Sequence, residues 1–245
     1  MILKGKNILI TGGATGIGLA LAKNLSNLGN TVIVCGRRQQ KLEEAKQKIP
    51  SLNIRKCDIT NNNDRVSMYK WIDSSFGGID ILVNNAGIQR YLDMRERNEM
   101  PNNDEIEINF SSLVNISYLF LPMLMKRKEA AIINVSSGLG FVPLARFAVY
   151  SATKAAVHSF TMSLRHQMKD TCVKVYEIIP PIVHDTELKG KPIEKTENSV
   201  SSDEVADAVV DGISNDMPEI AVGTAKRWHT ASKSEAEEIF RRINS

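Results

Sequence analysis

The chain has 245 residues, of which 42% are hydrophobic and 24% charged, and its formal net charge is +3. These values are ordinary for one globular domain with a sizeable core. Lysine and arginine are interspersed with acids, and the longest apolar run, residues 118–125, is too short to span a bilayer, so the sequence argues against nucleic-acid and membrane partners.

The first predicted element is an apolar strand at residues 7–10. It runs into Thr11-Gly12-Gly13-Ala14-Thr15-Gly16-Ile17-Gly18, and a helical pattern follows until Gly29-Asn30. Glycines let the backbone turn tightly and approach a pyrophosphate, which binds at the N-terminus of the next helix. A strand, a glycine-rich turn and a helix in this order predict a dinucleotide site.

The next strand, residues 31–35, ends in Gly36-Arg37-Arg38. Sites for NAD place an acid about 20 residues beyond the glycines, whereas sites for NADP place an arginine there. The first acid after this strand is Glu43. We therefore predict a preference for NADP(H) over NAD(H), with Arg37 and Arg38 as phosphate ligands. The alternative is that both arginines are merely solvated at a helix start.

Strands and helices continue to alternate along the chain. Further strands are expected at 53–57, 79–83, 130–135, 173–179 and 219–222, and helices at 40–49, 62–76, 104–125, 150–168, 203–213 and 225–243. We expect Pro122 to kink or shorten the fourth of these helical patterns, counting the one after the glycines as the first. Such alternation predicts right-handed crossovers and a parallel sheet. We predict one α/β domain over residues 1–245, a Rossmann-type doubly wound sheet of about seven strands with helices on both faces.

Residues 182–200 follow Pro180-Pro181 and carry charges of both signs without a period. We interpret this segment as a long loop that serves as a substrate lid and is mobile when the site is empty. The alternative is a solvated surface loop without a role.

The fifth helical pattern begins with Val149-Tyr150-Ser151-Ala152-Thr153-Lys154. A tyrosine and a lysine four positions apart share one helix face, so the ammonium can lie against the phenol. At about 4 Å and an effective dielectric near 20, a unit charge lowers the pKa of a phenol by at most about three units. The pair therefore predicts an acid/base site, although this spacing also occurs by chance on helix surfaces.

Several motifs together resemble the short-chain dehydrogenase/reductase family. The resemblance covers residues 6 to about 186. It rests on the glycine turn, on Asn84-Asn85-Ala86-Gly87 after the fourth strand, on Asn109, and on Ser137 thirteen positions before Tyr150-x-x-x-Lys154. Within the family the chain is most similar to the small oxidoreductases encoded beside teichoic-acid D-alanylation genes.

The resemblance implies a role for each catalytic candidate. Tyr150 would be the general acid in carbonyl reduction and the base in alcohol oxidation. Lys154 would lower the pKa of the phenol and hold the ribose hydroxyls, and Ser137 would donate a hydrogen bond to the substrate oxygen. Asn109 would hold a water that relays protons. The cofactor-binding residues would be Gly12, Thr15, Gly16, Ile17, Gly18, Arg37, Arg38, Asp58, Ile59, Asn85, Ala86, Gly87, Tyr150, Lys154, Pro180 and Thr186.

Two departures from the family pattern qualify this picture. Pro180-Pro181 replaces the usual Pro-Gly, and the glycine-rich ending that often builds a tetramer contact is absent, so a homodimer is expected. The cysteines Cys35, Cys57 and Cys172 have no metal-ligand spacing. We read them as reduced core thiols, which predicts a cytoplasmic protein without a metal site.

The expected function is NADPH-dependent oxidation or reduction of a small carbonyl or alcohol substrate. Residues 139–147 suggest an apolar wall for its pocket. One alternative is a catalytically silent dinucleotide-binding sensor or interaction protein. Another is a sugar-nucleotide epimerase or dehydratase, but such enzymes need a second substrate domain, for which 245 residues leave little room.

Overall fold

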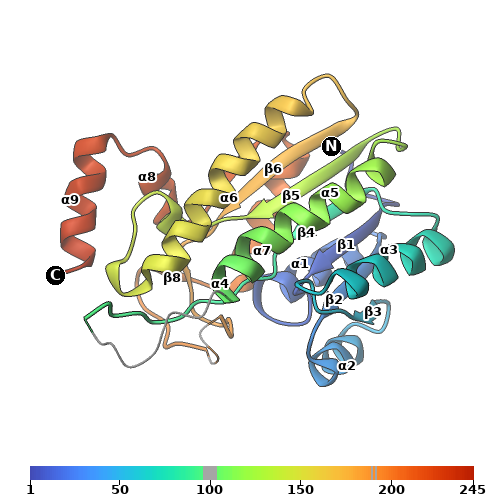
Figure 1. Ribbon diagram of the computed structural model, residues 1–245, viewed down its shortest axis with the longest axis horizontal. Coiled ribbons are helices and arrows are strands. Elements are labelled where there is room, and N and C mark those ends of the chain that lie inside the picture. Colours follow the sequence, from blue (N-terminus) through green and yellow to red (C-terminus); the bar gives the residue numbers. More distant parts are fainter. Residues whose placement is uncertain (96–103, 189, 191) are drawn as a thin grey trace.

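A computed structural model describes residues 1–95, 104–188, 190 and 192–245 of the chain. The described residues form a seven-stranded parallel sheet in the order β3-β2-β1-β4-β5-β6-β9 (Figure 1). Its strands are β1 (Asn7–Thr11), β2 (Thr31–Gly36), β3 (Asn53–Lys56), β4 (Ile81–Asn84), β5 (Ala130–Val135), β6 (Val173–Ile179) and β9 (Glu219–Ala221). The predicted parallel sheet is confirmed.

Helices cover both faces of this sheet. One face packs on α1 (Gly16–Asn27), α2 (Gln39–Lys48) and α7 (Ser202–Ser214). The other packs on α3 (Asn62–Phe76), α5 (Ser112–Leu124) and α6 (Ala148–Gln167). Two short helices, α8 (Ala225–His229) and α9 (Lys233–Ile243), lie at the end of the molecule away from α2 and α3 (Figure 1).

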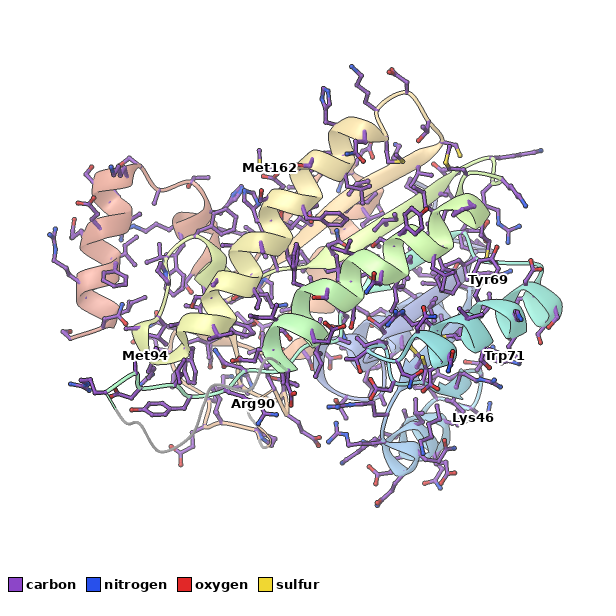
Figure 2. The ribbon with its side chains drawn as sticks, viewed as in Figure 1. Lys46, Tyr69, Trp71, Arg90, Met94 and Met162 are labelled. Atoms are coloured by element: carbon purple, nitrogen blue, oxygen red, sulfur yellow. The ribbon has the colours of Figure 1, made fainter. Side chains whose placement is uncertain are left out.

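The apolar core explains this doubly wound arrangement. Strand β1 is buried on both sides, with Ile8 and Ile10 in the cluster under α1 and Leu9 in the cluster under α5. On the second face, Tyr69 of α3, which is labelled in Figure 2, packs against Phe120 of α5 with ring centroids 5.3 Å apart. Strands that are apolar on both sides need helices on both faces to exclude water.

The structure corrects three of the predicted elements. Residues 182–200 are not all loop, because β7 (Ile182–Val183) pairs in parallel with β8 (Ser199–Val200). The predicted helix at 225–243 is two helices, since the Ser232 hydroxyl accepts a hydrogen bond from the Glu235 amide and starts α9 with a capping box. Both features depend on contacts that the hydrophobic periodicity of the sequence does not reveal.

The predicted helix at 104–125 is also interrupted. It consists of α4 (Asp104–Ile106), a π-helical turn at Glu107–Ser111, and α5, which contains Pro122 and ends at Leu124. A π-helical turn inserts one residue into the helix and frees backbone groups near functional positions. Here the inserted turn carries Asn109.

In the described ranges, none of the helices combines the length and the apolar character needed to cross a membrane.

Candidate active site

The predicted site residues gather at one edge of the sheet. Strands β1, β4, β5 and β6 are parallel and end at Thr11, Asn84, Val135 and Ile179. The strand order reverses between β1 and β4, where the carboxyl ends of the strands open a crevice. The glycine turn leaves β1, and Ser137 follows β5, so both predicted motifs border this edge.

The glycine turn is fastened to the segment after β4. The Thr11 hydroxyl accepts hydrogen bonds from the Asn85 and Ala86 amides, each at 3.1 Å. The Asn85 side chain donates to the Gly12 carbonyl at 3.1 Å. A Cβ on Gly18 would lie 2.5 Å from the Asn85 Nδ2 atom and 2.6 Å from the Gly12 oxygen, which no side chain tolerates. Glycine is therefore required here by packing.

The first turn of α1 is arranged to accept an anion. Gly16 has a φ of +52°, a conformation that favours glycine. Within the described chain, Thr15 makes no side-chain cap and the first turn of α1 holds no acid. The amides of this turn are therefore not capped by a side chain of the turn itself, and the helix dipole favours an anion beside them. A cavity of about 340 Å³ borders Thr15, Gly16, Lys41 and Glu187.

Ser137, Tyr150 and Lys154 come together as predicted. All three are buried, with 5%, 5% and 4% of their surface exposed. Ser137 lies close enough to the Tyr150 phenol to lower its pKa, and the Lys154 Nζ atom lies 5.5 Å from the centroid of the Tyr150 ring. The Lys154 ammonium donates to the Val135 carbonyl at 2.8 Å. The site therefore presents a hydroxyl, a phenol and an ammonium in one dry corner.

The expected fall in the pKa of the phenol is wrong for this arrangement. Burial raises the pKa of Tyr150 to about 12, while the hydrogen bond from Ser137 opposes that rise. The Lys154 ammonium is engaged with the Val135 carbonyl, and its field does not offset the desolvation of the phenolate. Tyr150 is therefore a protonated phenol at neutral pH.

Burial also lowers the pKa of Lys154, to about 8, while the negative charge of Glu177 opposes that fall. Glu177 lies on β6, next to β5, and none of its surface is exposed. The nearby carboxylate therefore helps the lysine to remain charged near neutral pH.

Asn109 has a different set of contacts from the one the resemblance implied. Its Oδ1 atom accepts from the Ile88 amide at 2.8 Å, and its Nδ2 atom donates to the Ile88 carbonyl at 2.9 Å and to the Thr153 hydroxyl at 3.1 Å. A Cβ on Gly87 would lie 3.3 Å from this Oδ1 atom and 3.7 Å from the Lys154 Nζ atom. Asn109 thus fixes the backbone after β4 beside Lys154 and α6.

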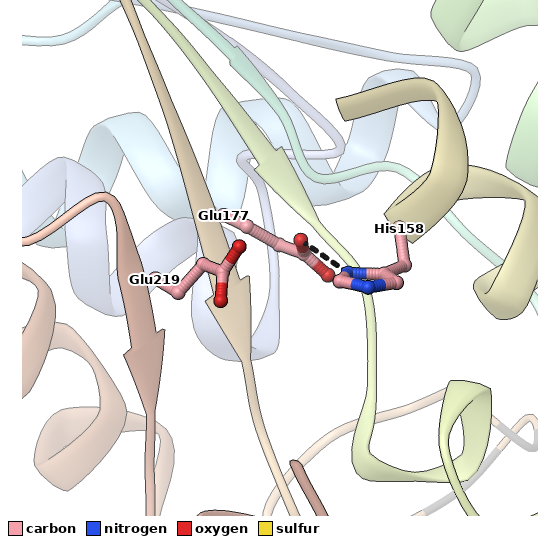
Figure 3. Close-up of side chains that lie close together, drawn as sticks. All are labelled: His158, Glu177 and Glu219. Carbon is pink, nitrogen blue, oxygen red and sulfur yellow. Dashed lines mark hydrogen bonds and ion pairs between the residues drawn. The ribbon is translucent and has the colours of Figure 1, made fainter. Parts of the chain in front are cut away.

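Figure 3 shows a further cluster of titratable side chains, formed by half-buried His158, buried Glu177 and half-buried Glu219. The His158 Nδ1 atom is 2.8 Å from Glu177, and Glu219 is the register partner of Glu177 on β9. These three residues have the donor types of a metal site. However, Glu219 already accepts from Arg165 at 2.8 Å and contacts the His229 Nε2 atom at 2.7 Å. The three residues are therefore already engaged with partners from the protein itself.

The remaining cofactor candidates occupy the expected edge. The Asp58 carboxylate accepts from the Thr60 amide and hydroxyl at 3.0 and 2.8 Å, and Ile59 is buried. The Pro180 carbonyl accepts from the Gly138 amide at 3.0 Å. Thr186 packs on the glycine turn, because a Cβ on Gly16 would lie 2.9 Å from its Cγ2 atom.

The two arginines after β2 differ. Arg38 begins α2 and pairs with Glu187 at 2.7 Å, whereas Arg37 is exposed and has no ion-pair partner among the described residues.

Within the expected lid, Lys189 and Lys191 lie outside the described residues.

The apolar wall predicted at 139–147 is partly used by the protein itself. Val142 and Phe147 are buried, and the Phe141 ring lies 4.5 Å from the His158 ring and 5.1 Å from the His229 ring, measured between centroids. Nearby, the backbone amide of Arg90 donates to Glu105 at 2.9 Å, and its side chain extends from the segment after β4 (Figure 2).

Sequence reasoning missed Glu177 and Glu187. A charged residue within Val173–Ile179, an otherwise mostly apolar strand, was a usable signal for Glu177. Glu187 gave no local signal, since its partner Arg38 is 149 positions away.

Comparison with known proteins agrees with this geometry. The family model described as short chain dehydrogenase matches residues 6–197. The oxidoreductase DltE of Bacillus subtilis (strain 168) is 43% identical over 250 residues, covering 100% of this chain and 99% of the relative.

Solved structures are also similar. A short chain dehydrogenase from Burkholderia cenocepacia J2315, in complex with NADP, has a TM-score of 0.85 and 26% identity over 100% of both chains. The fold is shared with a short chain dehydrogenase/reductase from Burkholderia phymatum in complex with NAD, at a TM-score of 0.82 and 19% identity, over 100% of this chain and 98% of that one. On the matched family model and the full-length relative, this chain belongs to the short-chain dehydrogenase/reductase family.

Proposed function

We propose that this protein is an NAD(P)(H)-dependent oxidoreductase that prefers NADPH and acts on a small carbonyl or alcohol substrate. The observation that carries the proposal is the convergence of Ser137, Tyr150 and Lys154, all buried, at the edge where the strand order reverses. The NADP and NAD complexes of the two solved neighbours support a nicotinamide cofactor.

The residues around the glycine turn fit such a cofactor. The uncapped start of α1 at Thr15, Gly16, Ile17 and Gly18 would hold the pyrophosphate. A Cβ on Gly36 would meet nothing within 4 Å, which leaves room beside Arg37 for a ribose and its phosphate. The remaining ligands would be Gly12, Asp58, Ile59, Asn85, Ala86, Gly87, Tyr150, Lys154, Pro180 and Thr186. When bound, the cofactor supplies or accepts the hydride.

The side chains divide the proton chemistry between them. The Tyr150 phenol is protonated at neutral pH, which is the form that gives a proton to a carbonyl oxygen. The Ser137 hydroxyl donates a hydrogen bond to the same oxygen as negative charge develops there. The Lys154 ammonium would hold the ribose hydroxyls of the bound cofactor. Asn109 positions the segment after β4, and the proton-relaying water beside it stays a prediction.

The burial of Lys154 disfavours the sensor alternative. Its pKa falls from the ordinary 10.5 to about 8 because the ammonium is out of water. Keeping it charged at neutral pH costs about 3 kcal/mol as an upper figure. A module that only bound a dinucleotide could use this charge for the ribose alone, whereas an acid/base enzyme also needs it beside the Tyr150 phenol and the Ser137 hydroxyl.

We also propose a cytoplasmic homodimer. Tyr118 of α5 and Met162 of α6 expose 81% and 52% of their surface on the outer side of adjacent helices, where Figure 2 shows Met162. Large apolar side chains on neighbouring helices favour a self-complementary contact. The three free thiols, Cys35, Cys57 and Cys172, favour a reducing compartment.

Replacement of Tyr150 by phenylalanine tests the acid/base role. We expect Tyr150→Phe to lower kcat about 10²- to 10⁴-fold because the ring still packs but carries no proton. NADPH affinity, measured by titration, should stay nearly unchanged. The control is Tyr69→Phe, which removes a hydroxyl on α3 far from the site. Turnover of Tyr150→Phe within threefold of the parent, on a panel of ketones, aldehydes and quinones, would contradict the role.

Replacement of Lys154 by methionine separates function from stability. We expect Lys154→Met to lose turnover and weaken cofactor binding, yet to unfold with a free energy about 1 to 2 kcal/mol higher at pH 7. The variant gains stability because it no longer buries an ammonium group away from water. It loses about 1 kcal/mol of that gain because the hydrogen bond to the Val135 carbonyl is gone. Between pH 8 and 10.5 the unfolded parent holds the proton more tightly than the folded one, so the parent gains stability with pH.

The difference between the two proteins should therefore shrink as pH rises through that window. Urea unfolding at pH 7, 8.5 and 10 measures it. A parent that is the more stable protein at pH 7 would contradict the account of Lys154.

Replacement of Arg37 by alanine tests the cofactor preference. We expect the parent to bind NADPH more tightly than NADH, and Arg37→Ala to weaken NADPH binding about ten- to a hundredfold, because a charge-assisted contact to phosphate is lost. NADH affinity, which involves no 2′-phosphate, is the internal control. Equal affinities of the parent for NADPH and NADH would refute the preference.

A further inference from the structure

A short segment after β7 crosses the crevice and is anchored on both sides of it. We call residues 184–188 the strap. The Asp185 carboxylate accepts from the Ser202 amide and hydroxyl at 2.8 and 2.7 Å, and Thr186 packs on Gly16. The Leu188 carbonyl accepts from the Gln89 amide at 3.2 Å. The strap thus runs from the start of α7, over the glycine turn, to the segment after β4.

Glu187 adds a fourth anchor through charge. Its Oε2 atom lies 2.7 Å from the Arg38 Nη1 atom, and its Oε1 atom lies 3.2 Å from the Lys41 Nζ atom. The pairing with Arg38, and then with Lys41, holds the pKa of Glu187 below its usual range. Both carboxylate oxygens are therefore used, and both cations belong to the start of α2, directly after the β2 corner.

We propose that Arg38, Lys41 and Glu187 form a clasp that closes the strap over the bound dinucleotide, which leaves recognition of the 2′-phosphate to Arg37 alone. The inference rests on the proposed function and deepens it, since it separates the roles of two neighbouring arginines. Arg38 cannot turn to a phosphate without leaving Glu187 with Lys41 alone, whereas Arg37 is exposed and has no ion-pair partner within the described residues.

The clasp makes a kinetic prediction. Because the strap lies over the glycine turn, the cofactor leaves only when the strap lifts, so a weaker clasp speeds release of any dinucleotide. A phosphate ligand behaves differently, since its loss affects NADPH alone. A carboxylate that competes with the 2′-phosphate would give a third result. If Glu187 occupied the place of that phosphate, removing its charge would tighten the binding of NADPH but not of NADH.

The experiment measures dissociation rates of NADPH and NADH by rapid mixing with an excess of the other oxidation state, following reduced-cofactor fluorescence. The proteins are the parent, Glu187→Gln, Arg38→Ala and the double variant. We expect each single change to speed the release of both cofactors equally, by about two- to fivefold, the range of partly exposed ion pairs. The double variant should be little faster than the faster single variant, because both changes open one clasp.

Glu44→Gln is the matched control. Glu44 also pairs with Lys41, at 3.2 Å, but it lies on α2 and does not touch the strap, so its release rates should equal those of the parent. Salt provides a second readout with NADH, which has no 2′-phosphate. Release from the parent should accelerate towards the Glu187→Gln rate at 1 M NaCl, because ions screen the clasp.

Three results would overturn the clasp. One is unchanged release in Glu187→Gln, and another is selectively tighter NADPH binding in that variant. The third is a loss of NADPH affinity in Arg38→Ala with NADH unaffected, which would make Arg38 a phosphate ligand and leave the NADPH preference standing. The two proposals can also fail separately. Equal affinities of the parent for NADPH and NADH would refute the cofactor preference, and faster release of both cofactors from the clasp variants would still establish the clasp.

Discussion

Removing an ammonium group from water is costly, and Lys154 stays charged inside this fold because the Val135 carbonyl accepts its hydrogen bond and Glu177 lies nearby. That arrangement needs the end of β5, the neighbouring strand β6 and the first turns of α6 in fixed positions. The same turns carry Tyr150. The acid/base pair is therefore set by the packing of α6 on the sheet, and a shift of this helix would move both groups together.

The group around Glu177 and Glu219 connects Lys154 to the C-terminal part of the chain. Glu177 and Glu219 are register partners on β6 and β9, so two carboxylates lie side by side in the interior. His158 and Arg165 of α6 and His229 of α8 surround them. A buried carboxylate is costly unless polar partners of this kind contact it. Through His229, helix α8 therefore joins the network next to Lys154, although α8 lies outside the predicted motifs.

Features that depend on neighbouring residues were predictable from the sequence, and features that depend on distant ones were not. Apolar periods located the strands of the sheet, and the glycine turn, Ser137 and Tyr150-x-x-x-Lys154 are local motifs whose positions the parallel sheet brings together. The pairing of Ile182 with Ser199 and of Arg38 with Glu187 needed the fold. The pKa of Tyr150 was misjudged because burial, which a spacing rule does not measure, outweighs the lysine.

The pairing of β7 with β8 brings the two ends of the intervening segment together on the body of the molecule. Lengthening a loop whose ends are already held costs little free energy, since the cost of closure grows only with the logarithm of length. Substitutions and insertions at residues 192–198, which follow the strap, should therefore be tolerated. The sheet, the glycine turn and the acid/base pair would keep their places. Evolution or protein engineering can in this way vary the length and composition of this surface segment without rebuilding the acid/base pair.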